Sequence, residues 1–441
     1  MLPSPRTLLL VVSLLFVSSN LMAESKFKEK LKEHNITETA VPDSTLPAMD
    51  RYNPELGYFQ KAYTDLGDPR FMYGAGNFAI GIGGTVRASA YFDIYGSPTN
   101  NKPNFSLADI SIPTDNANKF GLSASSSELH VKARRKLGKH QIIAYISMSV
   151  NDDEKIGLNL GYVSFDGFSI GKIYSFFMDL EAGTRTVDLS GPCSQIARAQ
   201  PLLGYTHIFN KHWTVGISAE KPEAKAEGYP EWGVELDNQP MPDIAFRGKY
   251  SWSKGHLQAA GLLRNMTVWH HQRGTVAVDQ GETLHELGWG VALSGKYAPS
   301  SKGHISFQTY YGRGIARYIN DISGLNLDMG VNDWNASTGL AESMKPVPVC
   351  GGFIAGRYRW TRCISSNAVL GYVRAGHPDN MVVKNPFKYS LYGAVNVFWA
   401  ITDYCSVGLE YTGGGRANYY EGNEPHYGRG NRINGTFIYQ F

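Results

Sequence analysis

Several features are scarce in this sequence, and each scarcity excludes a class of protein. Beyond the N-terminal segment no run of about 18 apolar residues occurs, which excludes a protein built from membrane-spanning helices. The four cysteines are far apart and lack the C-x-x-C spacing of zinc and redox sites. They are Cys193, Cys350, Cys363 and Cys405. The formal net charge is only +3, too small to predict a nucleic-acid partner.

Signatures of catalysis are also missing. No G-x-S-x-G motif occurs, and the glycine-rich stretches Gly81–Gly84 and Gly413–Gly415 do not precede a helical pattern that would hold a phosphate. His270 and His271 are the most suggestive pair for a metal, but adjacent side chains on a strand point in opposite directions. We therefore expect no catalytic residues, no metal site, no cofactor and no enzymatic activity.

Aromatic residues and glycine, in contrast, are abundant. The chain contains 26 Tyr, 20 Phe, 8 Trp and 48 Gly, while only 18% of its residues are charged. Repeated tight turns and two aromatic girdles give a transmembrane β-barrel this kind of composition. The composition favours such a barrel without deciding the fold.

The first residues have the pattern of an export signal. Arg6 supplies the positive region, Leu8–Val17 the apolar core, and Ala23 the end of a cleavage site. We expect residues 1–23 to be a signal peptide that directs the chain out of the cytoplasm.

The next segment, residues 24–78, is polar and irregular at the level of sequence. Glu24–His34 is predicted to form a short charged helix, before Pro42, Pro47 and Pro54 interrupt regular structure. We interpret this segment as a periplasmic lead-in to the domain that follows.

From about Ile80 to the C-terminus, apolar and polar side chains alternate with a period of two. Such alternation gives a strand one apolar face and one polar face. Short turns and long polar connections also alternate, as periplasmic turns and extracellular loops do in a membrane barrel. We therefore predict an all-β fold, in which residues 79–441 form a transmembrane antiparallel β-barrel of about sixteen strands. The last strand, Arg429–Phe441, ends on an aromatic residue, as expected for recognition by the barrel insertion machinery.

The phase of the alternation assigns the charged side chains to the inside of this barrel. A charge facing lipid costs about 2–4 kcal/mol at mid-depth, so charges belong to the opposite face. That face carries few acids, mainly Asp93, Glu128 and Glu410, and we expect a positively charged, anion-binding pore lining. An alternative is that the basic residues pair with acids across strands and fill space. The predicted pore-lining residues are Arg87, Lys132, Arg134, Arg247, Lys249, Arg264, Lys296, Arg357, Arg359 and Arg432.

One long connection, residues 177–198, is a candidate constriction loop. Folded into the pore, it would bring Asp179, Arg185 and Arg198 toward the solute path. The alternative is an ordinary surface loop.

Five short motifs of the chain form a recognisable set: Ser175–Asp179, Thr186–Asp188, Gly191–Pro192, Arg198–Pro201 and Gly312–Tyr318. With these motifs the chain resembles the DcaP-like trimeric outer-membrane porin family. The resemblance implies a homotrimer of sixteen-stranded barrels in the bacterial outer membrane that passes small anionic molecules, dicarboxylates among them, by diffusion. It also implies that the first and fourth motifs flank the constriction loop. In two respects the chain departs from the family pattern, because Glu24–His34 is short for a coiled coil and Cys193 is not part of the pattern.

The sequence thus predicts an outer-membrane porin for small anionic solutes. Its expected partners are outer-membrane lipid, those solutes, two further copies of the chain and the insertion machinery. The main alternative is an adhesin or structural barrel with a blocked lumen, and a barrel enzyme is a third possibility. Small residues on the inward face favour an open lumen because they leave room for water. They are Ser89, Ser147, Ser294, Ser306 and Ser406.

Overall fold

The computed structural model describes residues 71–441 apart from several short stretches. The predicted signal peptide and the helix at Glu24–His34 lie outside the described residues. In the part of the chain that is described, no helix is both long and apolar enough to cross a membrane. The excluded stretches are 76, 97, 99–102, 116–117, 152, 154, 189, 227–233, 237, 272–280, 336–339, 377–385 and 420–425.

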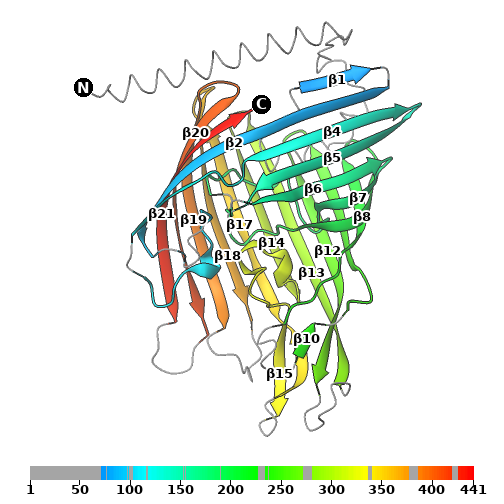
Figure 1. The fold of residues 1–441 in the computed structure, drawn as a ribbon, viewed down its shortest axis with the longest axis vertical. Coiled ribbons are helices and arrows are strands. Elements are labelled where there is room, and N and C mark those ends of the chain that lie inside the picture. The colour runs from blue at the N-terminus through cyan, green and yellow to red at the C-terminus, as the bar shows by residue number, and fades with distance from the viewer. Residues whose placement is uncertain are drawn as a thin grey trace.

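The described residues form a closed antiparallel barrel (Figure 1). Its sheet contains 19 strands, of which β1, β3 and β10 are short additions and the other sixteen form the ring. The predicted fold class and strand number are therefore confirmed. The sixteen are β2 (Phe78–Tyr95), β4 (Glu128–Leu137), β5 (His140–Val150), β6 (Ile156–Phe165), β7 (Phe168–Tyr174), β8 (Ala199–Ile208), β9 (Trp213–Glu220), β11 (Asp243–Trp252), β12 (Gly255–His271), β13 (Gly281–Ser300), β14 (Gly303–Arg313), β17 (Pro348–Arg359), β18 (Ile364–Ala375), β19 (Phe387–Ala400), β20 (Cys405–Asn418) and β21 (Tyr427–Gln440).

The short additions lie at the edges of this ring. β1 (Phe71–Ala75) pairs with the start of β2, so the sheet begins within the segment predicted as a lead-in. β3 (Lys119–Ser123) also pairs with β2, and β10 (Val234–Leu236) pairs with the far end of β12. A separate hairpin of β15 (Met329–Asn335) and β16 (Leu340–Pro346) extends from the loop end, at the bottom of Figure 1.

The ring closes where the first long strand meets the last. β2 and β21 pair from Thr85 and Gln440 along the seam. Beyond that pair, Gly84 N–H donates to the Phe441 carbonyl and Phe441 N–H donates to the Gly84 carbonyl, both at 3.0 Å. The seam therefore satisfies the backbone groups that an open edge would leave exposed to lipid.

Turns and loops segregate to opposite ends of the barrel, as predicted. The tight turns each join two ring strands, among them Asp166–Gly167 between β6 and β7. The polar composition of residues 265–284 predicts a long connection there, and this is wrong for the described parts: residues 265–271 and 281–284 are strand, because β12 and β13 pair as far as His271 and Gly281. Alternation continues there, with Met266 and Val268 buried in an apolar cluster among the extracellular loops.

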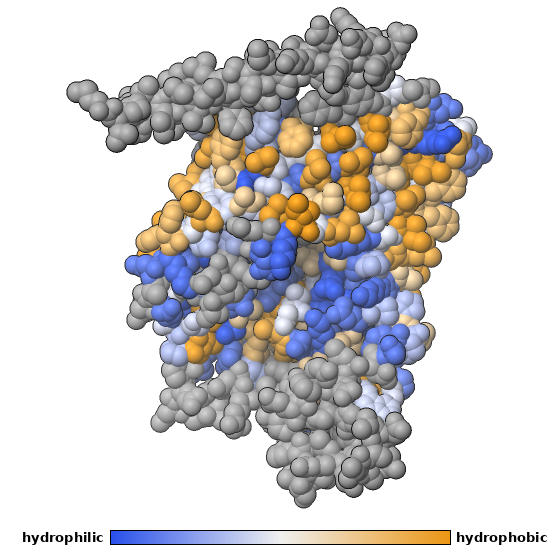
Figure 2. Space-filling model, in the orientation of Figure 1, coloured by the Kyte–Doolittle hydropathy of each residue, from blue (hydrophilic) through white to orange (hydrophobic). Residues whose placement is uncertain are grey.

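Side chains alternate around the wall as the sequence predicts. In β9, Val215 and Ile217 are 36% and 54% exposed, whereas Thr214 and Ser218 are buried. Hydrophobic side chains gather in Figure 2 over the half of the barrel nearer the turns, and hydrophilic ones toward the loops. An outward apolar face of this kind is the surface by which a membrane barrel contacts lipid.

The main apolar clusters lie inside the barrel, between the wall and loops that fold inward. One cluster joins inward residues of the wall, such as Tyr310 and Val373, to residues of the loop after β7 and of the loop after β14. A second joins Phe105, Leu107 and Ile110 of the first long loop to Phe353 and other inward side chains. Large parts of three loops thus occupy the interior, which the small inward residues of the wall did not predict.

If these side chains face lipid, the cost of a new charge in free energy of unfolding should depend strongly on its position in the strand. Replacing Ile217 with arginine should lower the free energy of unfolding by about 2–4 kcal/mol, because the new charge faces the hydrocarbon layer. Urea unfolding of the protein in lipid vesicles measures this difference. Ile217→Leu serves as the control, and an equally large loss in that variant would contradict the outward assignment.

Candidate functional site

The loop between β7 and β8, Ser175–Arg198, crosses the inside of the barrel, and we name it L3. Phe176 and Phe177 at its start are only 2% and 1% exposed. Glu220 at the end of β9 holds this start, because its carboxylate accepts hydrogen bonds from Ser175 Oγ (2.9 Å) and Phe176 N–H (3.0 Å). L3 is therefore not an ordinary surface loop.

The first half of L3 is anchored to β11, β12 and β13. Asp179 accepts a hydrogen bond from Ser294 Oγ at 2.6 Å and lies 2.9 Å from Nε2 of His256. Glu181 lies 2.6 Å from Lys249 Nζ and 3.4 Å from Nδ1 of the same imidazole. Burial alone would raise the pKa of Asp179, but the hydrogen bond and charge of His256 outweigh burial and lower it. Each of the two imidazole nitrogens lies close to a carboxylate, so His256 bridges Asp179 and Glu181.

The middle of L3 reaches the strands β19 and β20 of the wall. The guanidinium carbon of Arg185 lies 3.9 Å from the centre of the Phe398 ring, and its Nη2 is 3.4 Å from Ser406 Oγ. Asn396 Nδ2 donates to the Arg185 carbonyl at 3.0 Å. L3 is thus fixed to two separate regions of the wall.

A carboxylate pair holds the next part of L3. Glu410 of β20 accepts hydrogen bonds from the N–H groups of Val187 (2.7 Å) and Asp188 (2.8 Å). The Asp188 carboxylate accepts one from Phe105 N–H (3.2 Å), which ties the first long loop to L3. Burial, together with the negative charge of Glu410, raises the pKa of Asp188 to about 7. Arg87 Nη2 also donates to the Val187 carbonyl at 2.5 Å.

The end of L3 packs against the loop Gly314–Val347, which we name L6. Ala197 N–H donates to the Tyr318 carbonyl at 2.9 Å, and Asn320 N–H donates to the Gln195 carbonyl at 3.0 Å. Gln200 Nε2 also donates to Tyr318 Oη at 3.0 Å, so two motifs more than a hundred residues apart in the sequence, Arg198–Pro201 and Gly312–Tyr318, meet inside the barrel.

A buried ion-pair network surrounds this meeting point. Asp243 Oδ2 lies 3.1 Å from both Arg264 Nε and Arg317 Nη1, and accepts a hydrogen bond from Tyr318 Oη at 2.8 Å. Asp328 lies 3.0 Å from Arg264 Nη1. Each guanidinium is 1% exposed, so burial is possible only because carboxylates neutralise it.

The predicted pore-lining residues fall into three groups. Arg264, Arg432 and Lys249 are buried and paired with acids, Arg432 with Asp93 at 2.6 Å, as in the alternative interpretation of the sequence. A second group is buried and faces inward: Arg87, Lys132, Arg134 and Arg247. In a third group nearer the turns, Lys296 and Arg357 are half-buried, and Arg359 is exposed at the rim.

Of the three predicted constriction residues, Asp179 is buried, whereas Arg185 and Arg198 are half-buried. Arg198 Nη2 lies 3.3 Å from Glu223, which is also half-exposed. Aromatic packing holds a further cation against the loop, because the Arg247 guanidinium carbon lies 3.8 Å from the centre of the Phe176 ring.

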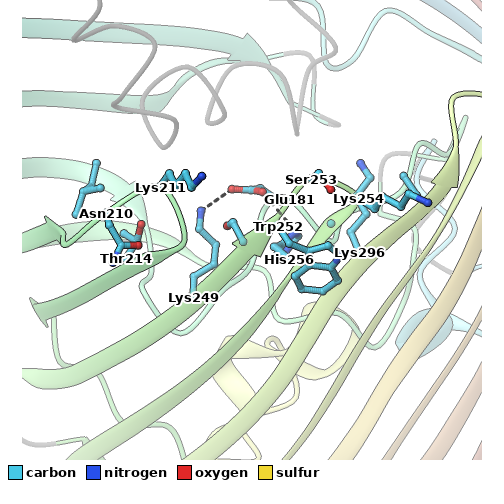
Figure 3. A pocket seen from close by; sticks show the side chains of 14 residues that line it. Glu181, Asn210, Lys211, Thr214, Lys249, Trp252, Ser253, Lys254, His256 and Lys296 are labelled. Atoms are coloured by element: carbon cyan, nitrogen blue, oxygen red, sulfur yellow. Dashed lines mark hydrogen bonds and ion pairs between the residues drawn. The ribbon is translucent and has the colours of Figure 1, made fainter.

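A cavity of about 490 Å³ opens between Glu181 of L3 and two of the periplasmic turns (Figure 3), and we call it the vestibule. Four lysines line it: Lys211, Lys249, Lys254 and Lys296. Glu181 is the one carboxylate among its lining residues, and Figure 3 draws it paired with Lys249. The vestibule therefore carries an excess of positive charge.

Sequence reasoning missed two sets of site residues. Lys211 and Lys254 lie in tight turns, where strand alternation does not assign a side chain to either face. The only sequence signal for them was that each turn adjoins strand residues predicted to face inward. Glu220 and Asp243 lie at the loop ends of their strands, and Asp328 lies within L6. Their partners could be identified only after L3 and L6 were placed inside the barrel.

Within the described residues no group of three His, Cys, Asp or Glu side chains is arranged to hold a metal ion. The backbone of His270 and His271 belongs to β12, but their side chains lie outside the described residues.

Comparison with known proteins places this architecture in context. A model of the DcaP outer membrane protein family matches residues 71–441. The outer membrane channel DcaP of Acinetobacter baumannii has a similar fold, with a TM-score of 0.68 and 15% sequence identity over 83% of this chain and 98% of that one. Vibrio cholerae OmpT is also similar, with a TM-score of 0.51 and 10% identity over 84% of this chain and 100% of that one. A search of curated proteins finds no match.

The ion-pair network predicts unequal effects of two similar substitutions. Asp243→Asn should lower the free energy of unfolding by roughly 3–5 kcal/mol, because two buried guanidinium groups lose a shared carboxylate. Glu223→Gln should cost about 0–1 kcal/mol, since that carboxylate is partly solvated. Chemical unfolding, with limited proteolysis of L6 as a second readout, measures both. Equal effects would argue against the network as the anchor of L6.

The raised pKa of Asp188 predicts a pH-dependent stability. The folded carboxyl, with its pKa of about 7, binds its proton more tightly than the unfolded one at 3.8. The resulting stabilisation is present below the unfolded pKa and is lost as the pH rises through about 7. Wild-type protein should therefore lose more unfolding free energy between about pH 5 and pH 8 than Asp188→Asn does. Parallel slopes for the two proteins in unfolding experiments would refute this assignment.

Proposed function

The chain belongs to the DcaP outer membrane protein family and is an outer-membrane porin, and we propose that it passes small anionic solutes in preference to cations. The observation that carries this proposal is the vestibule, where four lysines and a single carboxylate surround a cavity of about 490 Å³ beside L3. Such an excess of one sign raises the local concentration of counter-ions and steers them inward.

The distribution of acids supports this preference. Asp243 and Asp328 are paired with arginine, and Asp93 is paired with Arg432. Because each negative charge is neutralised by its partner, these carboxylates attract cations from solution only weakly. Glu410 is engaged by backbone N–H groups of L3. The cations of the vestibule, in contrast, face a single acid, Glu181.

L3 supplies the constriction in this proposal. Its half-buried charged side chains, Glu181, Arg185 and Arg198, are the charges that a passing solute can meet, whereas Asp179 and Asp188 are sequestered by the wall and the first long loop. Two of those three accessible side chains are cationic. A solute with two carboxylates could engage L3 and a vestibule lysine together, which favours dicarboxylates as a substrate class.

The inward loops give the blocked-barrel alternative a specific basis, because large parts of three loops fill the interior. Planar-bilayer reconstitution separates the two functions, since an open porin gives discrete conductance steps and a plugged barrel gives none. The homotrimer implied by the family resemblance is part of our proposal, and chemical crosslinking of the native protein in membranes tests it.

Selectivity should depend on the vestibule lysines. We expect reversal potentials in a potassium chloride gradient to favour chloride, and the triple change of Lys211, Lys254 and Lys296 to glutamine to lower the chloride-to-potassium permeability ratio on the order of twofold or more. Lys139→Gln, at a turn that does not contribute to the vestibule, is the matched control. Cation preference in the wild-type channel would overturn the proposal, and an unchanged ratio in the triple variant would remove its basis.

A further inference from the structure

An apolar trough runs across the lipid-facing surface of β14 and β17–β20. Two hollows of about 430 and 630 Å³ form it, and they are continuous because they share four lining residues. Those shared residues are Ile305, Gly356, Ala368 and Val395.

Small residues at outward positions create the trough. Gly356 pairs with Ala368 in one row across the strands, and Gly393 pairs with Gly413 in the next row. A Cβ atom added to Gly356 would meet nothing within 4 Å, so the surface is open there. The neighbouring apolar side chains protrude as walls, with exposures of 55% for Ile354, 62% for Leu370, 60% for Val395 and 50% for Tyr411.

The trough rises from the periplasmic rim into the membrane. Its periplasmic end includes Pro299, Ser300 and Gly303, which belong to the turn between β13 and β14 or adjoin it. From there the paired strands extend the trough toward the middle of the barrel wall, as far as Gly413 within β20. This course is that of an acyl chain whose headgroup lies at the periplasmic surface.

Basic and aromatic side chains gather at the periplasmic end of the trough. Lys302 and Arg362 are both exposed in the two adjoining turns. Trp360 is 62% exposed and packs edge-on against Tyr358, with ring centres 4.7 Å apart, as in an aromatic belt at headgroup depth.

We propose that the trough is a binding site for a phospholipid of the periplasmic leaflet. One acyl chain occupies the channel over Gly356, Ala368 and Gly393, and the phosphate is bound by Lys302 and Arg362, the cations of the two adjoining turns. Charge complementarity at the rim and the rise of the trough from rim to bilayer core favour this occupant over a second barrel, which would place no anion beside those cations. The site is independent of what the pore conducts.

Photolabelling of the full-length protein in vesicles tests the site. The probe is phosphatidylglycerol with a photoreactive group near the end of one acyl chain, in a background of phosphatidylethanolamine. We expect labelled peptides to come from β17–β19. Gly356→Phe, which fills the trough, should lower labelling there by about tenfold. Gly435→Phe is the matched control, because Gly435 also faces outward with open space around its Cβ, but on β21.

The headgroup contact has its own variant and control. Lys302→Gln combined with Arg362→Gln should lower labelling several-fold, whereas Lys136→Gln combined with Lys139→Gln at another turn should leave it unchanged. Equal labelling of Gly356→Phe and wild type would overturn the acyl-chain site, and insensitivity to the first pair would overturn the phosphate contact. Loss of oligomer mass in Gly356→Phe, with no specific lipid label in wild type, would instead identify a protein interface and also overturn the proposal.

Discussion

The structure depends on the closure of its sheet between β2 and β21. A bilayer offers no hydrogen-bond partners, so every backbone group in the spanning region must be satisfied by a neighbouring strand. The reciprocal hydrogen bonds between Gly84 and Phe441 complete that requirement at the place where an open sheet would have two edges. Once the ring is closed, each side chain of a strand faces either lipid or the lumen. Apolar and polar residues must therefore alternate along the sequence with a period of two.

Closure also determines what the interior can contain. Loops that fold into a ring of fixed size must bury polar backbone and charged side chains, and each buried charge then needs a partner. Asp243 and Asp328 meet Arg264 and Arg317 where L3 and L6 touch, whereas Glu410 and Asp188 hold the next part of L3. Charge is thereby neutralised where loops pack and retained where water remains, at the vestibule.

Sequence reasoning could predict the wall, and it could not predict the filling of the barrel. The alternation of residues such as Thr214 and Ile217 sets which side chains meet lipid, because strand geometry is local. The ion pairs of Arg264 could not be predicted from the sequence, because its partners come from β11 and from L6. Only the folded loops bring them together. Turn residues such as Lys254 follow no face rule, so their place around the vestibule could not be read from periodicity. The course of β12 to His271 was missed because loop-like composition concealed a strand that continues beyond the membrane.

L3 is fixed to the barrel wall at two places along its length. Its first half is tied to β11–β13 through Asp179 and Glu181, and its middle to β19 and β20 through Arg185 and Asp188. A loop held at two places cannot swing as a flap. It shifts only when the two groups of strands that anchor it move relative to each other. The bore is therefore mechanically coupled to the cross-section of the whole cylinder, so that lateral pressure in the surrounding bilayer, by making the barrel rounder or flatter, acts on the passage from outside it.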